Sequence, residues 1–202
     1  MRPRRSNAPL SLVVGAHPHN LGDGDLARGL AAGQGWAIVE TWQRFAPMVL
    51  RMAERSLGSR AEAEDVGQEV FYHVFRKART LREPDSLRSF VYSFAVRTVK
   101  AELRRRKVRG WFPFLRAEVP ADDVGTPALD VESRDRLRQL YALLDRLPAR
   151  DRLVFVLRRM ESKTVEEIAA ALDISRSTVK RSMAHASSRL AVWIDAEARR
   201  HP

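Results

Sequence analysis

The sequence predicts an all-α protein made of two small helical domains. Apolar residues recur at three- and four-residue steps through most of the 202 residues, and no alternating apolar and polar run indicates a strand. Residues 110–133 are rich in proline and acidic side chains and show no regular period, which is typical of a flexible linker. We therefore expect a mobile tail at 1–24, a helical domain at 25–109, this acidic linker, and a second domain at 134–197.

The charge of the chain favours a polyanionic partner. Lys and Arg outnumber Asp and Glu by 36 to 25, a net charge of +11. Both ends of the chain are basic, with 20 basic and 11 acidic residues in 1–109 and 15 basic and 9 acidic residues in 134–202. Such a balance indicates nucleic acid or an acidic membrane surface as the partner. Fully extended, the linker reaches roughly 70–80 Å, so the two domains can occupy separate sites.

Several classes of protein are excluded by composition. The chain has no cysteine, which rules out disulfides, thiolate zinc sites and cysteine nucleophiles. The apolar stretch 8–16 is much shorter than the ~20 residues that span a bilayer, and no secretory cleavage site follows it. We expect a cytoplasmic protein without membrane insertion.

Two helices are predicted in the first part of the 25–109 domain. An apolar stripe runs from 36 to 57 and ends at Gly58, a residue that tolerates the left-handed end of a helix. A second helix at 61–78 has a broad apolar face, and the opposite face is polar. Because this polar face carries carboxylates on a strongly basic protein, it predicts a contact with a basic protein surface. Its members include Asp65, Gln68, Glu69 and Tyr72.

The third helix, 86–109, is predicted to have one buried face and one cationic face. At 100° per residue, an apolar set that includes Phe94 clusters on one side. The opposite side carries a cationic stripe that suits a row of phosphates, made of Arg97, Lys100, Arg104 and Lys107. A plain solvated basic face is the alternative interpretation.

The second domain carries a helix-turn-helix pattern. Thr164 and Glu167 form a capping box, which predicts that a helix begins there. Asp173 stands in the turn, and Ser175 is placed to cap a second helix whose Val179 points inward. The side chains expected to reach a DNA groove from this second helix, or to hold its backbone, are Arg176, Ser177, Thr178, Lys180, Arg181, Ala184 and Ser188. A simple helical hairpin is the alternative.

Enzymatic functions find little support in the sequence. The five histidines are scattered, and no phosphate-binding loop, nucleophile elbow or dinucleotide motif accompanies a strand-to-helix pattern. We expect no catalytic residue, metal or cofactor. A metal-dependent nuclease that uses Glu64, Asp65 and Glu69 is kept as the enzymatic alternative.

Motifs from both predicted domains resemble those of the bacterial extracytoplasmic-function (ECF) sigma factors of RNA polymerase. The run 60–71 and the following Phe-Arg-Lys-Ala at 75–78 are similar to the family's polymerase-binding helix. The segments 147–152, 166–169 and 177–180 are similar to its second domain. The resemblance covers about residues 25–195 with the motifs in the family's order.

The resemblance implies a sigma factor without catalytic activity that recognises promoters and helps melt them. Its implied partners are core RNA polymerase, promoter DNA and an anti-sigma factor. The resemblance places Asp65, Gln68 and Glu69 against the β′ coiled coil. It assigns the −10 element to the loop 79–89 and the cationic stripe, with Tyr92 and Phe94 as candidate platforms for an unstacked base. The helix after Ser175 is assigned to the −35 element, read by Arg176, Ser177, Thr178, Lys180 and Arg181.

Five residues depart from the pattern of many relatives. Arg97 and Ala101 replace an asparagine and an aspartate, and Ser182, His185 and Ser187 stand where arginines are common. These departures leave a second function open, an autonomous helix-turn-helix regulator that binds duplex DNA without polymerase.

Overall fold

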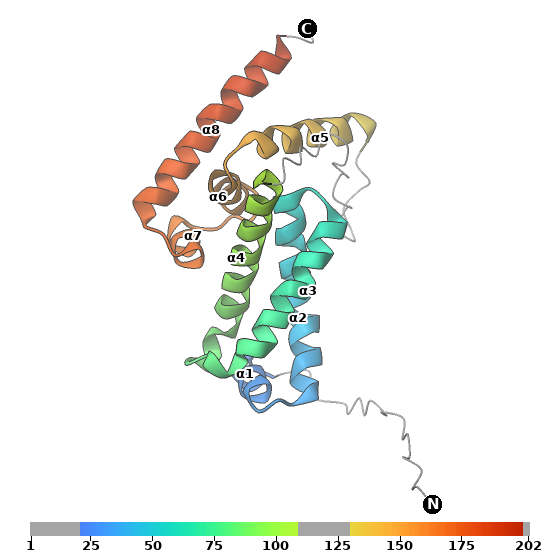
Figure 1. The fold of residues 1–202 in the computed structure, drawn as a ribbon, viewed down its shortest axis with the longest axis vertical. Helices are drawn as coiled ribbons and strands as arrows, with labels where there is room; N and C mark the ends of the chain where they lie inside the picture. The colour runs from blue at the N-terminus through green and yellow to red at the C-terminus, as the bar shows by residue number, and fades with distance from the viewer. Residues whose placement is uncertain (1–20, 109–129, 200–202) are drawn as a thin grey trace, which may run out of the picture.

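The computed structural model describes residues 21–108 and 130–199, and in these two ranges every regular element is a helix. The all-α prediction is therefore confirmed. Figure 1 shows α2, α3 and α4 side by side in one half of the molecule, with α5 to α8 packed beside and above α4.

The first domain contains four α-helices and two short 3-10 turns. α2 packs against α3 and α4, while α1 lies across their lower end in Figure 1. Helix α1 begins inside the segment predicted as a tail, so the helical domain starts two residues earlier than expected, and residues 1–20 lie outside the described part. The elements are α1 (Asp23–Ala31), α2 (Gly35–Leu57), α3 (Arg60–Lys77), η1 (Ala78–Thr80), η2 (Pro84–Ser86) and α4 (Leu87–Val108).

Local sequence sets the α2–α3 corner. Gly58 ends α2 with φ of 71°, in the left-handed region that glycine occupies without a Cβ penalty. Ser59 then caps α3 by accepting a hydrogen bond from the Glu62 amide. Gly67 lets the two helices approach, since a Cβ at this position would lie 2.8 Å from Cδ2 of Leu50. The corner holds the polar face of α3 away from the core.

The second domain contains the four remaining helices. Asp130 caps the first of them, which begins three residues before the predicted domain start at 134, so residues 131–133 are helical and not linker. The rest of the predicted linker, 110–129, lies outside the described residues. The elements are α5 (Val131–Arg146), α6 (Ala149–Arg159), α7 (Val165–Leu172) and α8 (Arg176–Ala198).

The helix-turn-helix prediction is confirmed residue by residue. Thr164 and Glu167 form both hydrogen bonds of the capping box at the start of α7. Asp173 occupies the left-handed region with φ of 54°, and Ser175 caps α8 by accepting from the Thr178 amide. Val179 is buried between the two helices.

The two domains pack against each other, which the sequence did not predict. α4 contacts both α6 and α7, and α2 contacts α6. A single hydrophobic cluster includes residues from all four of these helices, whereas a second cluster lies between α5, α6 and α8. Because the first cluster extends across the domain contact, α4 is covered both by α2 and α3 of its own domain and by α6 and α7 of the other.

Candidate functional site

Of the two carboxylates among the three predicted polymerase-binding residues on α3, one is free and one is paired. Asp65 and Gln68 are exposed, and Asp65 has no ion-pair partner within the described residues. The Glu69 carboxylate lies 3.3 Å from the Arg105 guanidinium of α4, which raises the pKa of Arg105 through that hydrogen bond. His73 lies 3.8 Å from the same carboxylate. The structure therefore places the three predicted residues on one surface, but Glu69 already forms an ion pair with Arg105 of the same chain.

The cationic stripe of α4 borders the second domain. Arg97, Arg104 and Lys107 are exposed, and Lys100 is half-buried. Burial lowers the pKa of Lys100, and the neighbouring Arg104 and Arg150 guanidiniums lower it further. Lys100, Arg104, Lys107 and Arg150 line a groove of about 480 Å³, and none of its lining residues in the described part of the chain is a carboxylate. The stripe is a cationic surface, and α6 adds one more cation to it.

Tyr92 differs from its expected position on an accessible surface. Its side chain is buried, and the hydroxyl has no hydrogen-bond partner among the residues that the structure describes. The Lys163 ammonium from the α6–α7 turn lies over its ring, 5.0 Å from the centroid. Burial raises the pKa of Tyr92 above its usual range. Part of this cover comes from the second domain, because Lys163 lies in the turn between α6 and α7, and α7 itself packs against α4.

Phe94, which the helical periodicity placed on the core stripe, is half-buried, and its ring lies beside four other side chains. Its ring is stacked with His73 at 6.2 Å and meets Phe90 edge-on at 4.9 Å. The Arg97 guanidinium lies 5.1 Å from its centroid and the Lys77 ammonium 5.8 Å. An aromatic ring flanked by cations is suited to an unstacked base and its phosphates. The signal in the sequence was the spacing of three and four residues between Phe90, Phe94 and Arg97.

The first turns of α8 present the predicted DNA-reading residues to solvent. Arg176, Ser177, Lys180 and Arg181 are exposed, and Thr178 is half-buried. The Ser175 hydroxyl lies within 2.9 Å of the hydroxyls of both Ser177 and Thr178, which fixes the start of the helix. Ala184 and Ser188 are also exposed farther along α8.

Two of the departures from the family pattern have a structural role. The buried Ser182 hydroxyl accepts a hydrogen bond from Nε of Arg150 at 3.0 Å. Nδ1 of His185 lies 2.7 Å from the buried Asp151 carboxylate. Both contacts join α8 to the start of α6, so these residues orient the recognition helix within its domain.

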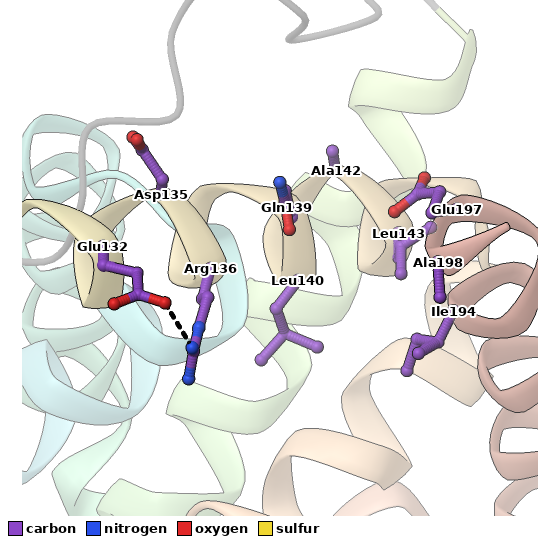
Figure 2. A pocket seen from close by; sticks show the side chains of 10 residues that line it. All are labelled: Glu132, Asp135, Arg136, Gln139, Leu140, Ala142, Leu143, Ile194, Glu197 and Ala198. Carbon is purple, nitrogen blue, oxygen red and sulfur yellow. Dashed lines mark hydrogen bonds and ion pairs between the residues drawn. The ribbon is translucent and has the colours of Figure 1, made fainter. Parts of the chain in front are cut away.

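A larger groove lies at the opposite end of α8, between α5 and the last turns of α8. Its volume is about 790 Å³, and Figure 2 shows Leu140 and Ile194 pointing into it beside the Glu132–Arg136 ion pair. Among residues 21–108 and 130–199, no group of three or more His, Asp or Glu side chains is arranged to bind a metal ion. None of the helices in the same ranges is both long enough and apolar enough to cross a membrane.

Known proteins similar to the chain fall in one family. Two family profiles match it: Sigma-70 region 2 over residues 41–109 and Sigma-70, region 4 over residues 137–190. The ferric citrate uptake sigma factor FecI of Escherichia coli is 30% identical over 134 residues, which cover 65% of this chain and 76% of that protein. The ECF RNA polymerase sigma factor SigE of Mycolicibacterium smegmatis is 32% identical over 150 residues, 71% of this chain and 58% of that protein.

A solved structure has the same fold. The sigma factor RpoE from Bartonella quintana, solved with the anti-sigma factor NepR, superposes with a TM-score of 0.56 at 18% identity. The match covers 77% of this chain and 95% of that one. With two separate surfaces on α3 and α4, a helix-turn-helix, and both sigma-70 regions in order, the chain belongs to the ECF sigma factors, the dissociable subunits that direct bacterial RNA polymerase to promoters.

Proposed function

We propose that three surfaces of this sigma factor bind three different partners during transcription initiation. The face of α3 formed by Asp65, Gln68 and Glu69 binds the basic coiled coil of the polymerase β′ subunit. The α4 stripe holds the non-template strand of the −10 element, and the start of α8 reads the −35 element. The observation that carries this assignment is the separation of charge. Carboxylates face outward on α3, and the cations gather on α4 and at the start of α8.

The −10 assignment rests on cations placed beside an aromatic ring. Arg97, Lys100, Arg104 and Lys107 follow one side of α4, which suits a strand of phosphates. Phe94 lies beside Arg97, and the Arg97 guanidinium is near the Phe94 ring. The ring offers a face on which a base can stack. Tyr92 remains a predicted second platform, accessible only after the second domain moves off it.

The −35 assignment rests on the exposed N-terminal turns of α8. Arg181 is the side chain best suited to base readout, because a guanidinium can donate two hydrogen bonds to the edge of guanine. Arg176, Ser177, Thr178 and Lys180 surround it and can hold phosphates. Ser182 and His185 hold α8 against α6 through Arg150 and Asp151, so we assign them no contact with a base.

We extend the proposal to domains and partners. Residues 25–109 act as the region 2 domain, 134–197 as the region 4 domain, and 110–133 as the link between them, with α1 and the start of α5 added to the respective domains. An anti-sigma factor is proposed as a regulator, since such a complex is known for the RpoE relative. The protein is proposed to act in the cytoplasm with polymerase and to catalyse no reaction of its own.

Transcription with purified components tests the function. Core polymerase and this protein should together start run-off transcripts from defined sites in a genomic library, and neither should do so alone. Arg181→Ala should change the −35 bases preferred, while Lys100→Ala should weaken use of all promoters alike. Footprints on duplex DNA without polymerase, and no transcript with it, would favour the autonomous regulator. Magnesium-dependent cleavage lost in Asp65→Ala would favour the nuclease.

A further inference from the structure

The groove between α4 and the start of α6 gathers cations from two helices that lie side by side in Figure 1. Its volume of about 480 Å³ lies within the range of small-molecule sites, roughly 300–1,000 Å³. The three cations of α4 that line it form no ion pair within the described residues. The lining cations are Lys100, Arg104 and Lys107 of α4 and Arg150 of α6. The groove therefore attracts an anion.

The cations of the groove repel one another. Partial burial lowers the pKa of Lys100, and the charges of Arg104 and Arg150 lower it further. Asp173 has the opposite effect on this pKa, but its contribution is the smallest. Because like charges held together destabilise a folded protein, a cluster of this kind indicates a ligand that compensates them.

Arg150 is held in place and still has free donors. Its Nε donates a hydrogen bond to the Ser182 hydroxyl at 3.0 Å. Its two terminal nitrogens have no hydrogen-bond partner within the described part of the chain. The neighbouring Asp151 carboxylate is buried against His185 and does not line the groove. A guanidinium fixed in this way can donate two parallel hydrogen bonds to a phosphate.

The first turn of α6 adds backbone donors at the same place. Pro148 precedes the helix, and no side chain among the described residues caps it. The amides of a first turn have no acceptor within their own helix, and the helix dipole gives this end a partial positive charge. Ala149 and Arg150 of this turn line the groove. Backbone amides therefore supplement the four side-chain cations.

The length and the walls of the groove indicate the class of anion. Lys100 and Lys107 are seven residues apart, about 10 Å along α4, so the row of cations is longer than one phosphate group and suits a chain of phosphates. The remaining walls are aliphatic and can cover a sugar or a base. They are formed by Val108, Pro148, Ala149 and Ile174.

We propose that this groove binds a small polyphosphate, such as the phosphate chain of a nucleotide, through Arg150 and the three α4 cations. A bound polyphosphate occupies Lys100, Arg104 and Lys107, so it competes with the −10 strand for these side chains. The binding site is independent of the proposed function, whereas the competition rests on it.

Calorimetric titration of the full chain tests the site, with inorganic tripolyphosphate and magnesium-free ATP as probes. At least one probe should bind with one ligand per chain, and inorganic monophosphate should bind at least tenfold more weakly. Tighter binding of ATP would assign the aliphatic walls to a nucleoside, and equal or weaker binding would assign the groove to an inorganic chain. Binding of neither probe, or of several tripolyphosphates per chain, would overturn the proposal.

Variants separate this site from general attraction to a basic protein. Arg150→Ala and Arg104→Ala should each raise the Kd for tripolyphosphate about tenfold, because each removes a charge-assisted hydrogen bond. Arg104 is exposed and makes no contact with α8, so its variant remains informative if Arg150→Ala disturbs the fold. Arg97→Ala is the matched control, since Arg97 is exposed on the same stripe but does not line the groove.

The control has a distinct expected result. Arg97→Ala should weaken binding to oligothymidine and leave the Kd for tripolyphosphate within twofold of the parent value. Circular dichroism confirms that each variant is folded. Equal losses of tripolyphosphate affinity in Arg97→Ala and Arg104→Ala would show attraction by overall charge and refute the site.

Failure of this site and failure of the sigma function give different results. Tripolyphosphate should raise the apparent Kd of the parent protein for oligothymidine, and the increase should be smaller in Arg150→Ala. A protein that starts transcripts with core polymerase but binds neither probe refutes this inference alone. A protein that binds one tripolyphosphate but yields no transcript supports the site and refutes the proposed function.

Discussion

Charge reversal at Asp65 is the sharpest test of the polymerase-binding surface. The side chain is exposed and has no ion-pair partner within the described part of the chain. Asp65→Arg should therefore change the free energy of unfolding by no more than about 0.5 kcal/mol. Glu69→Arg is a poorer probe, because it also breaks the pair with Arg105 and sets two guanidiniums together.

The expected loss of affinity follows from the environment of Asp65. A carboxylate about 4 Å from a cation gains at most ~4 kcal/mol at an effective dielectric constant near 20. Side-chain entropy and salt reduce this value, but reversal turns attraction into repulsion. We expect a loss of about 2–3 kcal/mol, which raises the Kd for core polymerase about 30- to 150-fold.

The assay is an anisotropy titration of labelled protein with purified core polymerase at low and moderate salt. Asp135→Arg on α5 is the matched control, since it makes the same charge change on an exposed acidic residue of the other domain. Thermal unfolding by circular dichroism confirms that each variant is folded. A Kd for Asp65→Arg within twofold of the parent, or an equal loss in Asp135→Arg, would refute the assignment of this face.

Four further predictions concern stability and DNA binding. Burial raises the pKa of Tyr141 to about 12, whereas the unfolded chain has the ordinary value of 10.0. The folded state therefore keeps the phenol proton more tightly, and the free energy of unfolding falls as the pH rises from 10 towards 12. Between pH 9 and 11 the parent should lose about 1 kcal/mol more than Tyr141→Phe in urea unfolding, and equal losses would contradict the assignment. Thr164→Ala removes a capping-box acceptor and should cost about 1 kcal/mol in the same assay. Asp173→Val should destabilise by about 1–2 kcal/mol more than Asp173→Gly, because of the left-handed backbone there; a smaller difference would argue against strain at the turn. Lys100→Ala combined with Arg104→Ala should reduce the slope of log affinity for oligothymidine against log salt by about 1.4, and an unchanged slope would remove both from the phosphate contacts.

Local patterns predicted the helices that have clear ends. The boundary at Gly58, the capping box at Thr164 and the turn at Asp173 all depend on neighbouring residues, and each lies where the sequence indicated. The two domain starts that differed, at α1 and α5, lie beside segments with many turn-forming residues, where the periodic signal is weak. The domain boundaries therefore moved by a few residues, while the order of the elements did not.

The candidate surfaces show the same division between local and distant information. Periodicity was sufficient to place Asp65, Lys100 and Arg181 on polar helix faces, because those faces repeat every 3.6 residues. It did not reveal that Arg105 pairs with Glu69, a residue 36 positions away. Nor did it reveal that Tyr92 is buried, because part of its cover is Lys163, which lies between α6 and α7 in the other domain.

The sequence alone thus established an all-helical chain with a helix-turn-helix, an acidic face on one helix and a cationic stripe on another. Each of these features depends on residues that lie close together along the chain. The three-dimensional packing settled which side of α4 is free, how Ser182 and His185 are used, and that the two domains are joined. Those outcomes depend on which apolar helix faces, distant in the sequence, pack against each other and exclude water. The periodicity of one helix does not indicate which other helix will pack against it.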